Sequence, residues 1–273
     1  MMFLKLIGGN IIMAFDKNEL ILDRVRNLVA TDLATGQLIF RLTSLEEPSL
    51  QCTAEGEEIT DAIGAVITTL YRAKKATFSA TNSLLSLDLA AAQYGTKKEV
   101  GSETSKITTP TYEIIKVPTD ATSITLAKTP VGDIPFIYSF ESGEIAKAYK
   151  VGSVASESEF VVGENGVITL PTGVTGKIYV PYKYDTANAV RVVNSASKFP
   201  EACGLQIYAY FKDKCNENVV YSGVIVCPKA KLNPEQIELA LTSTGKHGFE
   251  MTMMKDYCAD EGEDDLFTII VSE

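Results

Sequence analysis

The final part of the chain, residues 205–273, alternates apolar and polar side chains with a period of two. Such alternation places every second side chain on one face of a strand, which is the pattern of a half-buried sheet. Short connections between segments of this kind favour antiparallel neighbours. The pattern therefore predicts an antiparallel β-sheet, and no catalytic motif lies on it. Five segments carry the pattern: 205–211, 219–227, 237–241, 249–253 and 266–271, with Pro228 ending the second and the turn 245–248 preceding the fourth.

The charge balance limits the partners that the chain can bind. The 273 residues include 25 Lys and Arg against 35 Asp and Glu, which gives a net charge of −10. A protein that grips nucleic acid needs basic patches that displace counterions, so an acidic chain argues against that role. A hydrophobic content of 45% is enough for one large β domain or two ordinary ones.

The five cysteines are odd in number, and none of them forms a CxxC pair. We interpret them as buried free thiols in a protein made in a reducing cytoplasm, in preference to disulfide or metal roles. They are Cys52, Cys203, Cys215, Cys227 and Cys258.

The N-terminal segment, residues 1–13, is interpreted as a leader or arm. Its short apolar run is too short to span a bilayer, and no small-residue cleavage site follows it. Gly8-Gly9 can be encoded by a purine-rich ribosome-binding sequence that lies a few codons before Met13, which would make Met13 the first residue. The start of the protein is therefore left open between Met1 and Met13.

Residues 14–110 are predicted to begin the main β domain, with strands at 26–32, 37–42, 62–70 and 76–81. Between them, 43–58 reads as a long polar connection, which is typical of a functional segment, and 72–75 as a solvated basic bend. The best helix candidate is 83–94. Asn82 or Ser83 can cap its start and Gly95 can end it, and its leucines should pack on the sheet. These leucines are Leu84, Leu85, Leu87 and Leu89.

Residues 111–194 have the strand and turn rhythm of a β-sandwich, with Asn165-Gly166 as a strong hairpin turn. Residues 97–110 before them read as a linker or exposed hairpin, and 195–273 return to the first domain. We therefore predict a mainly β chain with one helix, in which an antiparallel sandwich or barrel of 14–110 and 195–273 carries an inserted immunoglobulin-like β-sandwich. The predicted strands of the insert are 114–117, 123–127, 136–140, 145–151, 160–162, 167–170, 177–184 and 189–193.

The chain offers little for catalysis. Its one histidine, His247, lies in a Gly-flanked turn and is interpreted as a surface residue. The acidic run 260–265 could hold calcium, but its spacing departs from the EF-hand pattern, so we interpret it as a solvated loop. No glycine-rich phosphate loop is present. We predict a protein that is not an enzyme, with no catalytic, cofactor-binding or metal site and no cofactor.

Three segments carry a resemblance to proteins of tailed bacteriophages. Residues 72–95 resemble the strand-to-helix passage of phage structural proteins, and 249–258 with 266–271 are similar to the closing strands of phage tail tube (major tail) proteins. Residues 177–184 look like part of the immunoglobulin-like modules of phage virions. The resemblance implies rings of six copies, stacked into a tube through which DNA passes without specific binding. It further implies a location in the virion tail, synthesis in the bacterial cytoplasm, other tail proteins as partners, and no membrane.

Two alternatives stay open. The insert makes the chain larger than a minimal tube subunit, which leaves a capsid decoration protein or another head protein. A cell-surface adhesion or carbohydrate-binding β protein is a third hypothesis, which exposed aromatic side chains and a secretion signal would favour. Within the tube hypothesis, Glu238 and Glu250 are expected on the outward positions of the terminal sheet as candidates for the lining of the bore. The sequence leaves the host and a contractile sheath undetermined.

Overall fold

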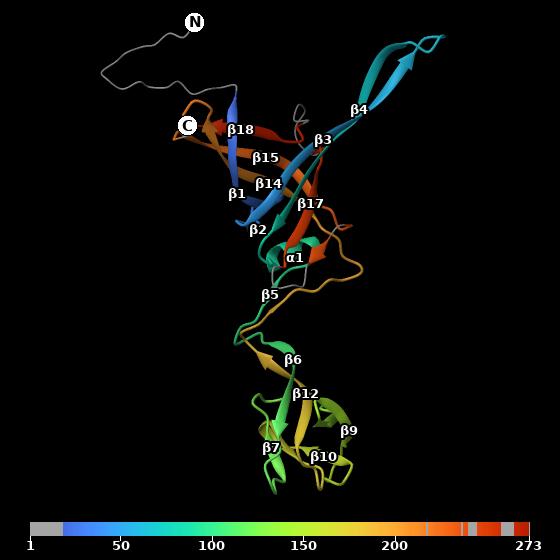
Figure 1. The fold of residues 1–273 in the computed structure, drawn as a ribbon, viewed down its shortest axis with the longest axis vertical. Coiled ribbons are helices and arrows are strands. Elements are labelled where there is room, and N and C mark those ends of the chain that lie inside the picture. Colours follow the sequence, from blue (N-terminus) through green and yellow to red (C-terminus); the bar gives the residue numbers. More distant parts are fainter. Residues whose placement is uncertain (1–18, 217, 236, 240–244, 258–264, 273) are drawn as a thin grey trace, which may run out of the picture. The chain divides into compact units, whose positions relative to one another are not determined.

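The computed structural model describes residues 19–216, 218–235, 237–239, 245–257 and 265–272. These residues form two compact units (Figure 1). The first joins the described residues up to Lys98 with those from Val192 onward, and the second is Glu99–Arg191. The predicted leader 1–13 and most of the acidic loop 260–265 lie outside the described residues.

The first unit is one sheet in the order β2-β1-β14-β15-β17-β4-β3, with β18 also paired to β15 and β16 to β17. All its strand pairings within the described residues are antiparallel, as the alternation predicted. Its strands are β1 Leu20–Asp32, β2 Leu38–Leu42, β3 Leu45–Thr60, β4 Val66–Asn82, β14 Ala202–Asp213, β15 Val220–Leu232, β16 Glu238–Leu239, β17 His247–Met253 and β18 Thr268–Ser272.

The sheet curls around a single core, because strands from opposite ends of the strand order supply the same buried cluster. Phe40 of β2 and Phe78 of β4 belong to it, together with Leu205 of β14 and Met251 of β17. The single α-helix in the described residues, α1 (Leu87–Gln93), adds Leu89 to this core. The predicted mainly β fold with antiparallel sheets and one helix is confirmed.

The helix starts later than predicted. Ser86 caps α1, since its hydroxyl accepts a hydrogen bond from the Leu89 amide at 3.2 Å. The segment before it cannot supply the expected packing, and Leu84 and Leu85 are each 62% exposed. The C-terminal end is as predicted, because Gly95 has a φ of +63° and the Thr96 amide donates to the Ala91 carbonyl.

Two connections predicted from polarity are strands. Residues 43–58 were expected to form a polar connection, but most of them belong to β3, where backbone pairing with β4 outweighs the low apolar content. The basic run 72–75 does not end a strand but lies within β4, at a register shift where Ala73 has a φ of +51°. Pro228 also falls inside a strand, β15, next to a register shift opposite Gly204 that spares it a ladder hydrogen bond.

The second unit contains a seven-stranded sheet in the order β6-β12-β8-β9-β10-β11-β7, with a separate two-stranded sheet of β5 and β13. Its buried cluster takes residues from both ends of this sheet, including Ile124 of β7 and Ile178 of β12, so the sheet curls around one core. Most strands lie close to the predicted ones, but β5 and the start of β6 fall inside the predicted linker 97–110. The immunoglobulin-like character stays a prediction. The strands are β5 Glu99–Val100, β6 Ile107–Lys116, β7 Ser123–Thr125, β8 Phe136–Glu141, β9 Glu144–Val151, β10 Glu159–Val162, β11 Val167–Thr169, β12 Lys177–Thr186 and β13 Val190–Arg191.

The end of α1 generates a stability prediction. A Cβ on Gly95 would lie 2.1 Å from the Phe199 carbonyl oxygen, in addition to the strain of a positive φ. Gly95→Ala should therefore lower the free energy of unfolding by about 3 kcal/mol or more, measured by denaturant titration. The matched control is Gly36→Ala, which has a φ of +68° and nothing within 4 Å of the added atom. It should cost only about 1–2 kcal/mol; equal losses for both variants would contradict the close approach.

Candidate assembly surfaces

Strands β3 and β4 form a long ribbon whose outer part, residues 53–75, we call the arm. β17 pairs with β4 from Ala76 to Asn82, so within the described residues the arm's two strands pair only with each other. The arm ends in a turn where the Asp61 carboxylate accepts hydrogen bonds from the Ile63 amide at 3.0 Å and the Ala65 amide at 2.8 Å. Figure 1 shows the ribbon continuing beyond the body of its own sheet.

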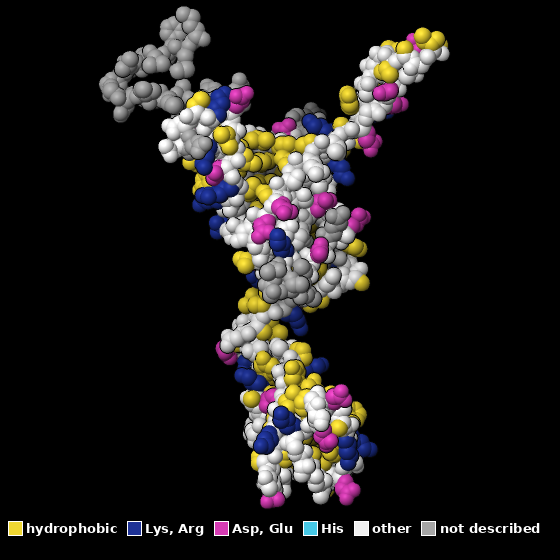
Figure 2. All heavy atoms as spheres, in the orientation of Figure 1, with side chains coloured by type: hydrophobic (Ala, Val, Ile, Leu, Met, Phe, Trp, Pro, Cys, Tyr) yellow, Lys and Arg dark blue, Asp and Glu magenta, His cyan; other side chains and the backbone are white. Residues whose placement is uncertain are grey.

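The arm exposes large apolar side chains along its length and at its tip (Figure 2). Ile63 in the turn is 90% exposed, and Tyr71 on β4 is 74% exposed. A two-stranded ribbon has no third layer to cover either face, and an isolated hairpin is only marginally stable in water. Burial of these side chains against another molecule would therefore stabilise the arm. The other exposed apolar residues are Ile59, Val66, Ile67 and Leu70.

An acidic hollow of about 490 Å³ lies over β4 and β17, away from the core. Both residues expected on the outward face of the terminal sheet, Glu238 and Glu250, line it. Glu47 and Glu235, which the sequence did not single out, complete a group of four carboxylates. The Glu250 carboxylate also accepts a hydrogen bond from the Asn233 side-chain amide at 3.1 Å. A cluster of four carboxylates repels polyanions.

His247 is buried, and its interpretation as a surface turn residue was wrong. It begins β17, is 1% exposed, and its Nε2 lies 2.6 Å from the Gln93 Oε1 of α1. Because the Gln93 amide nitrogen donates to the Gly248 carbonyl, Oε1 is the acceptor and the His247 Nε2 carries the proton. Its Nδ1 has no hydrogen-bond partner among the described residues. Burial lowers the pKa of His247.

The four described cysteines are free thiols, as expected, but only two are buried. Burial raises the pKa of Cys203 to about 12 and that of Cys227 to about 11, so both are inert thiols in the core. Cys52 and Cys215 are exposed, which contradicts the expectation of buried thiols for them. Cys258 lies outside the described residues.

Within the described residues, no group of His, Cys, Asp or Glu side chains has an arrangement that could hold a metal ion. The same part of the chain has no helix that is long and apolar enough to cross a membrane. What the described residues do bring together are surfaces suited to contacts between macromolecules: the arm and the acidic hollow.

Comparison with known proteins gives one family. The sequence model of the YomU/Tube protein family matches residues 20–264, which is most of the chain and includes both units. No curated protein matches the chain.

The buried histidine makes the stability of the first unit depend on pH. The pKa of His247 is lowered in the folded chain, so below its ordinary value of 6.5 the unfolded chain binds more protons. Stability should be full above that value and should fall in the pH window below it, where the unfolded chain becomes protonated and the folded ring stays neutral.

Denaturant unfolding at several pH values measures this loss, and His247→Gln should reduce the slope in that window. Since the chain has one histidine, its ring resonances can be followed without assignment of others. An unchanged slope in the variant, or titration of the folded ring at its ordinary value, would contradict the buried neutral state.

Proposed function

The chain belongs to the YomU/Tube protein family, and from this membership we propose that it is the structural subunit of a phage tail tube. In this proposal, six copies form a ring and the rings stack into a tube through which DNA passes. The protein has a structural role without catalysis, its partners are further copies of itself and other tail proteins, and its place is the tail of the virion.

The arm is the observation that carries the proposed self-assembly. Its apolar side chains, such as Ile63 and Tyr71, are exposed, and its two strands are paired only to each other in the described part of the chain. A surface of this kind gains stability when a neighbouring subunit covers it. The unpaired edge of β3 offers main-chain groups to the same neighbour, which favours strand addition.

The acidic hollow supports the proposed passage of DNA. Duplex DNA carries one phosphate charge per about 1.7 Å of its axis, and a basic lining would bind it and hold it back. Carboxylates such as Glu238 and Glu250 repel phosphates, so a bore lined by them would keep DNA moving. We therefore assign the face of β4 and β17 that bears this hollow to the inside of the ring.

The second unit is proposed to be a module carried by the tube wall, with the predicted insert 111–194 as its body. The chain enters and leaves it side by side, since Val190 and Arg191 pair with Val100 and Glu99. The Arg191 guanidinium also contacts the Glu99 carboxylate, with Nε at 3.0 Å. Neighbouring ends are the arrangement that lets a domain be inserted without strain on its host.

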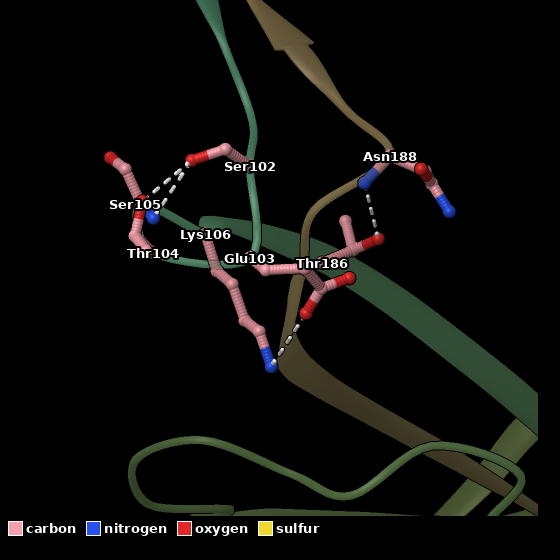
Figure 3. Close-up of polar contacts among 7 residues, drawn as sticks. All are labelled: Ser102, Glu103, Thr104, Ser105, Lys106, Thr186 and Asn188. Atoms are coloured by element: carbon pink, nitrogen blue, oxygen red, sulfur yellow. Dashed lines mark hydrogen bonds and ion pairs between the residues drawn. The ribbon is translucent and has the colours of Figure 1, made fainter.

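A tight turn follows the entry into this unit (Figure 3). The Ser105 amide donates to the Ser102 Oγ at 3.0 Å, and the Lys106 ammonium lies 3.9 Å from the Glu103 carboxylate. On the returning strand, the Asn188 amide donates to the Thr186 hydroxyl at 3.1 Å. These contacts join residues that are close in sequence, so they stabilise the entering and the leaving segment within the second unit itself.

Assembly should require the arm. Purified full-length protein at high concentration, examined by electron microscopy, is expected to form hollow rings or tubes. A variant in which an Asn-Gly turn joins Thr53 directly to Lys75 should fold but stay monomeric, because it lacks the apolar arm surface. Tyr71→Ser should weaken assembly in sedimentation velocity, whereas the matched change Thr68→Ser should not. Assembly by the armless variant, or a location on the capsid shell of the virion, would overturn the proposal.

The second unit should fold independently and be dispensable for assembly. A fragment of residues 99–191 contains a complete buried cluster and is expected to unfold in one cooperative thermal transition. Deletion of the whole second unit, with Lys98 bridged to Val192 by a short Gly-Ser linker, should leave tube formation intact. A fragment without a cooperative transition, or a deletion that folds but does not assemble, would contradict this division of roles.

A further inference from the structure

The second unit has a sheet face that points away from its core and is covered with aromatic side chains. Core residues Ile115, Ile137 and Ile178 fix the alternation on β6, β8 and β12, so their neighbours point outward. The outward residues Tyr112, Tyr138, Tyr179 and Phe136 form what we call the aromatic face. Tyr112 is 60% exposed and Phe136 is 44% exposed.

The rings of the aromatic face form a continuous path across three strands. Tyr112 and Tyr179 stack with centroids 5.1 Å apart, Tyr138 follows at 6.1 Å from Tyr179, and Phe136 at 6.5 Å from Tyr138. Each step is comparable to the length of one hexose unit. Tyrosine offers such a ligand an apolar ring and a hydroxyl at its tip.

Two lysines at one end of this face give it a positive charge. Lys116 and Lys177 lie directly opposite each other on β6 and β12, both exposed and on the same side as the rings. Neither has a carboxylate partner within the described residues. Like charges in opposed positions destabilise a sheet, and an anion placed between them would remove that cost. Asp185 lies on the same face but toward the other end of β12. Its carboxylate accepts a hydrogen bond from the Thr108 hydroxyl at 2.6 Å.

We propose that the aromatic face and the Lys116–Lys177 pair form a binding site for an anionic polysaccharide. The sugar C–H surfaces pack on the rings, the tyrosine hydroxyls bond the sugar hydroxyls, and the lysines pair with carboxylate or phosphate groups of the polymer. Charge complementarity with the Lys116–Lys177 pair selects an anionic chain. The site does not depend on tube formation.

The ring geometry favours a sugar over a nucleic acid base. Tyr112 and Tyr179 stack on each other with an interplanar angle of 28°, so each covers part of its partner's face. A base needs an open ring face on which to stack. A sugar, with its mixed C–H and hydroxyl surface, can use the exposed ring edges and the hydroxyls. A single strand of DNA is therefore a competing outcome for the test.

The test is binding of full-length protein to alginate, hyaluronate and phosphomannan as anionic polysaccharides, measured by affinity electrophoresis and calorimetry. Dextran serves as the neutral polysaccharide, poly-L-glutamate as the acidic chain without sugar, and oligo-dT as the nucleic acid. At least one anionic polysaccharide should bind more tightly than all three of these. Tyr112→Ala should weaken that binding by about tenfold, and Lys177→Gln should weaken it and reduce its salt dependence.

Matched variants keep the test specific. Tyr257→Ala removes an exposed tyrosine of the first unit, and Lys106→Gln removes a lysine of the second unit outside the face. Neither should change binding. The proposal is overturned if no anionic polysaccharide binds, if the matched variants lose as much affinity, or if dextran, poly-L-glutamate or oligo-dT binds equally well. Loss of self-association in Tyr112→Ala would show instead that the face contacts a second copy of the chain.

Discussion

The first unit depends on hydrogen bonding between strands that are far apart in the sequence. β17 pairs with β4 on one side and with the end of β15 on the other, while β14 pairs with β1. These ladders join the N-terminal and C-terminal parts into one sheet around one core. Since the entropy of closing such long loops is lost before the contacts form, this unit is expected to fold more slowly than one with local contacts. The second unit interrupts the sequence of the first unit, but its two ends lie side by side because they pair as β5 and β13.

Periodicity was sufficient to predict the strands that have one buried face. β14, β17 and the strands of the second unit alternate clearly, and the structure places them close to the predicted ranges. It failed for β3, which has no buried residue, because neither face of its outer part packs against a core. Backbone pairing makes that strand, and a side-chain pattern cannot reveal it. Leu84 and Leu85 made the predicted helix too long for the opposite reason. They are apolar, but both are exposed instead of packing on the sheet.

The candidate surfaces were only partly accessible to sequence reasoning. Glu238 and Glu250 could be placed on an outward face by alternation, but Glu47 joins them only through the β3–β4–β17 pairing. The aromatic face had no sequence signal, because Tyr112, Tyr138 and Tyr179 come from separate strands and meet through register. His247 was misjudged since its neighbouring glycines suggest a turn, whereas Gln93, 154 positions away, provides a buried hydrogen-bond partner.

The arm combines features that protect an unassembled subunit with features that favour association. Pro48 and the acidic residues along β3 discourage indiscriminate pairing of its edge. The arm itself keeps its apolar residues on a ribbon held mainly by its own ladder and by the Asp61 turn. A ribbon with few buried contacts has a low local stability, so ordering it costs free energy that only a specific neighbour can offset. In the proposed tube, the favoured neighbour is therefore one that covers the apolar residues and pairs with the free edge of β3 at the same time.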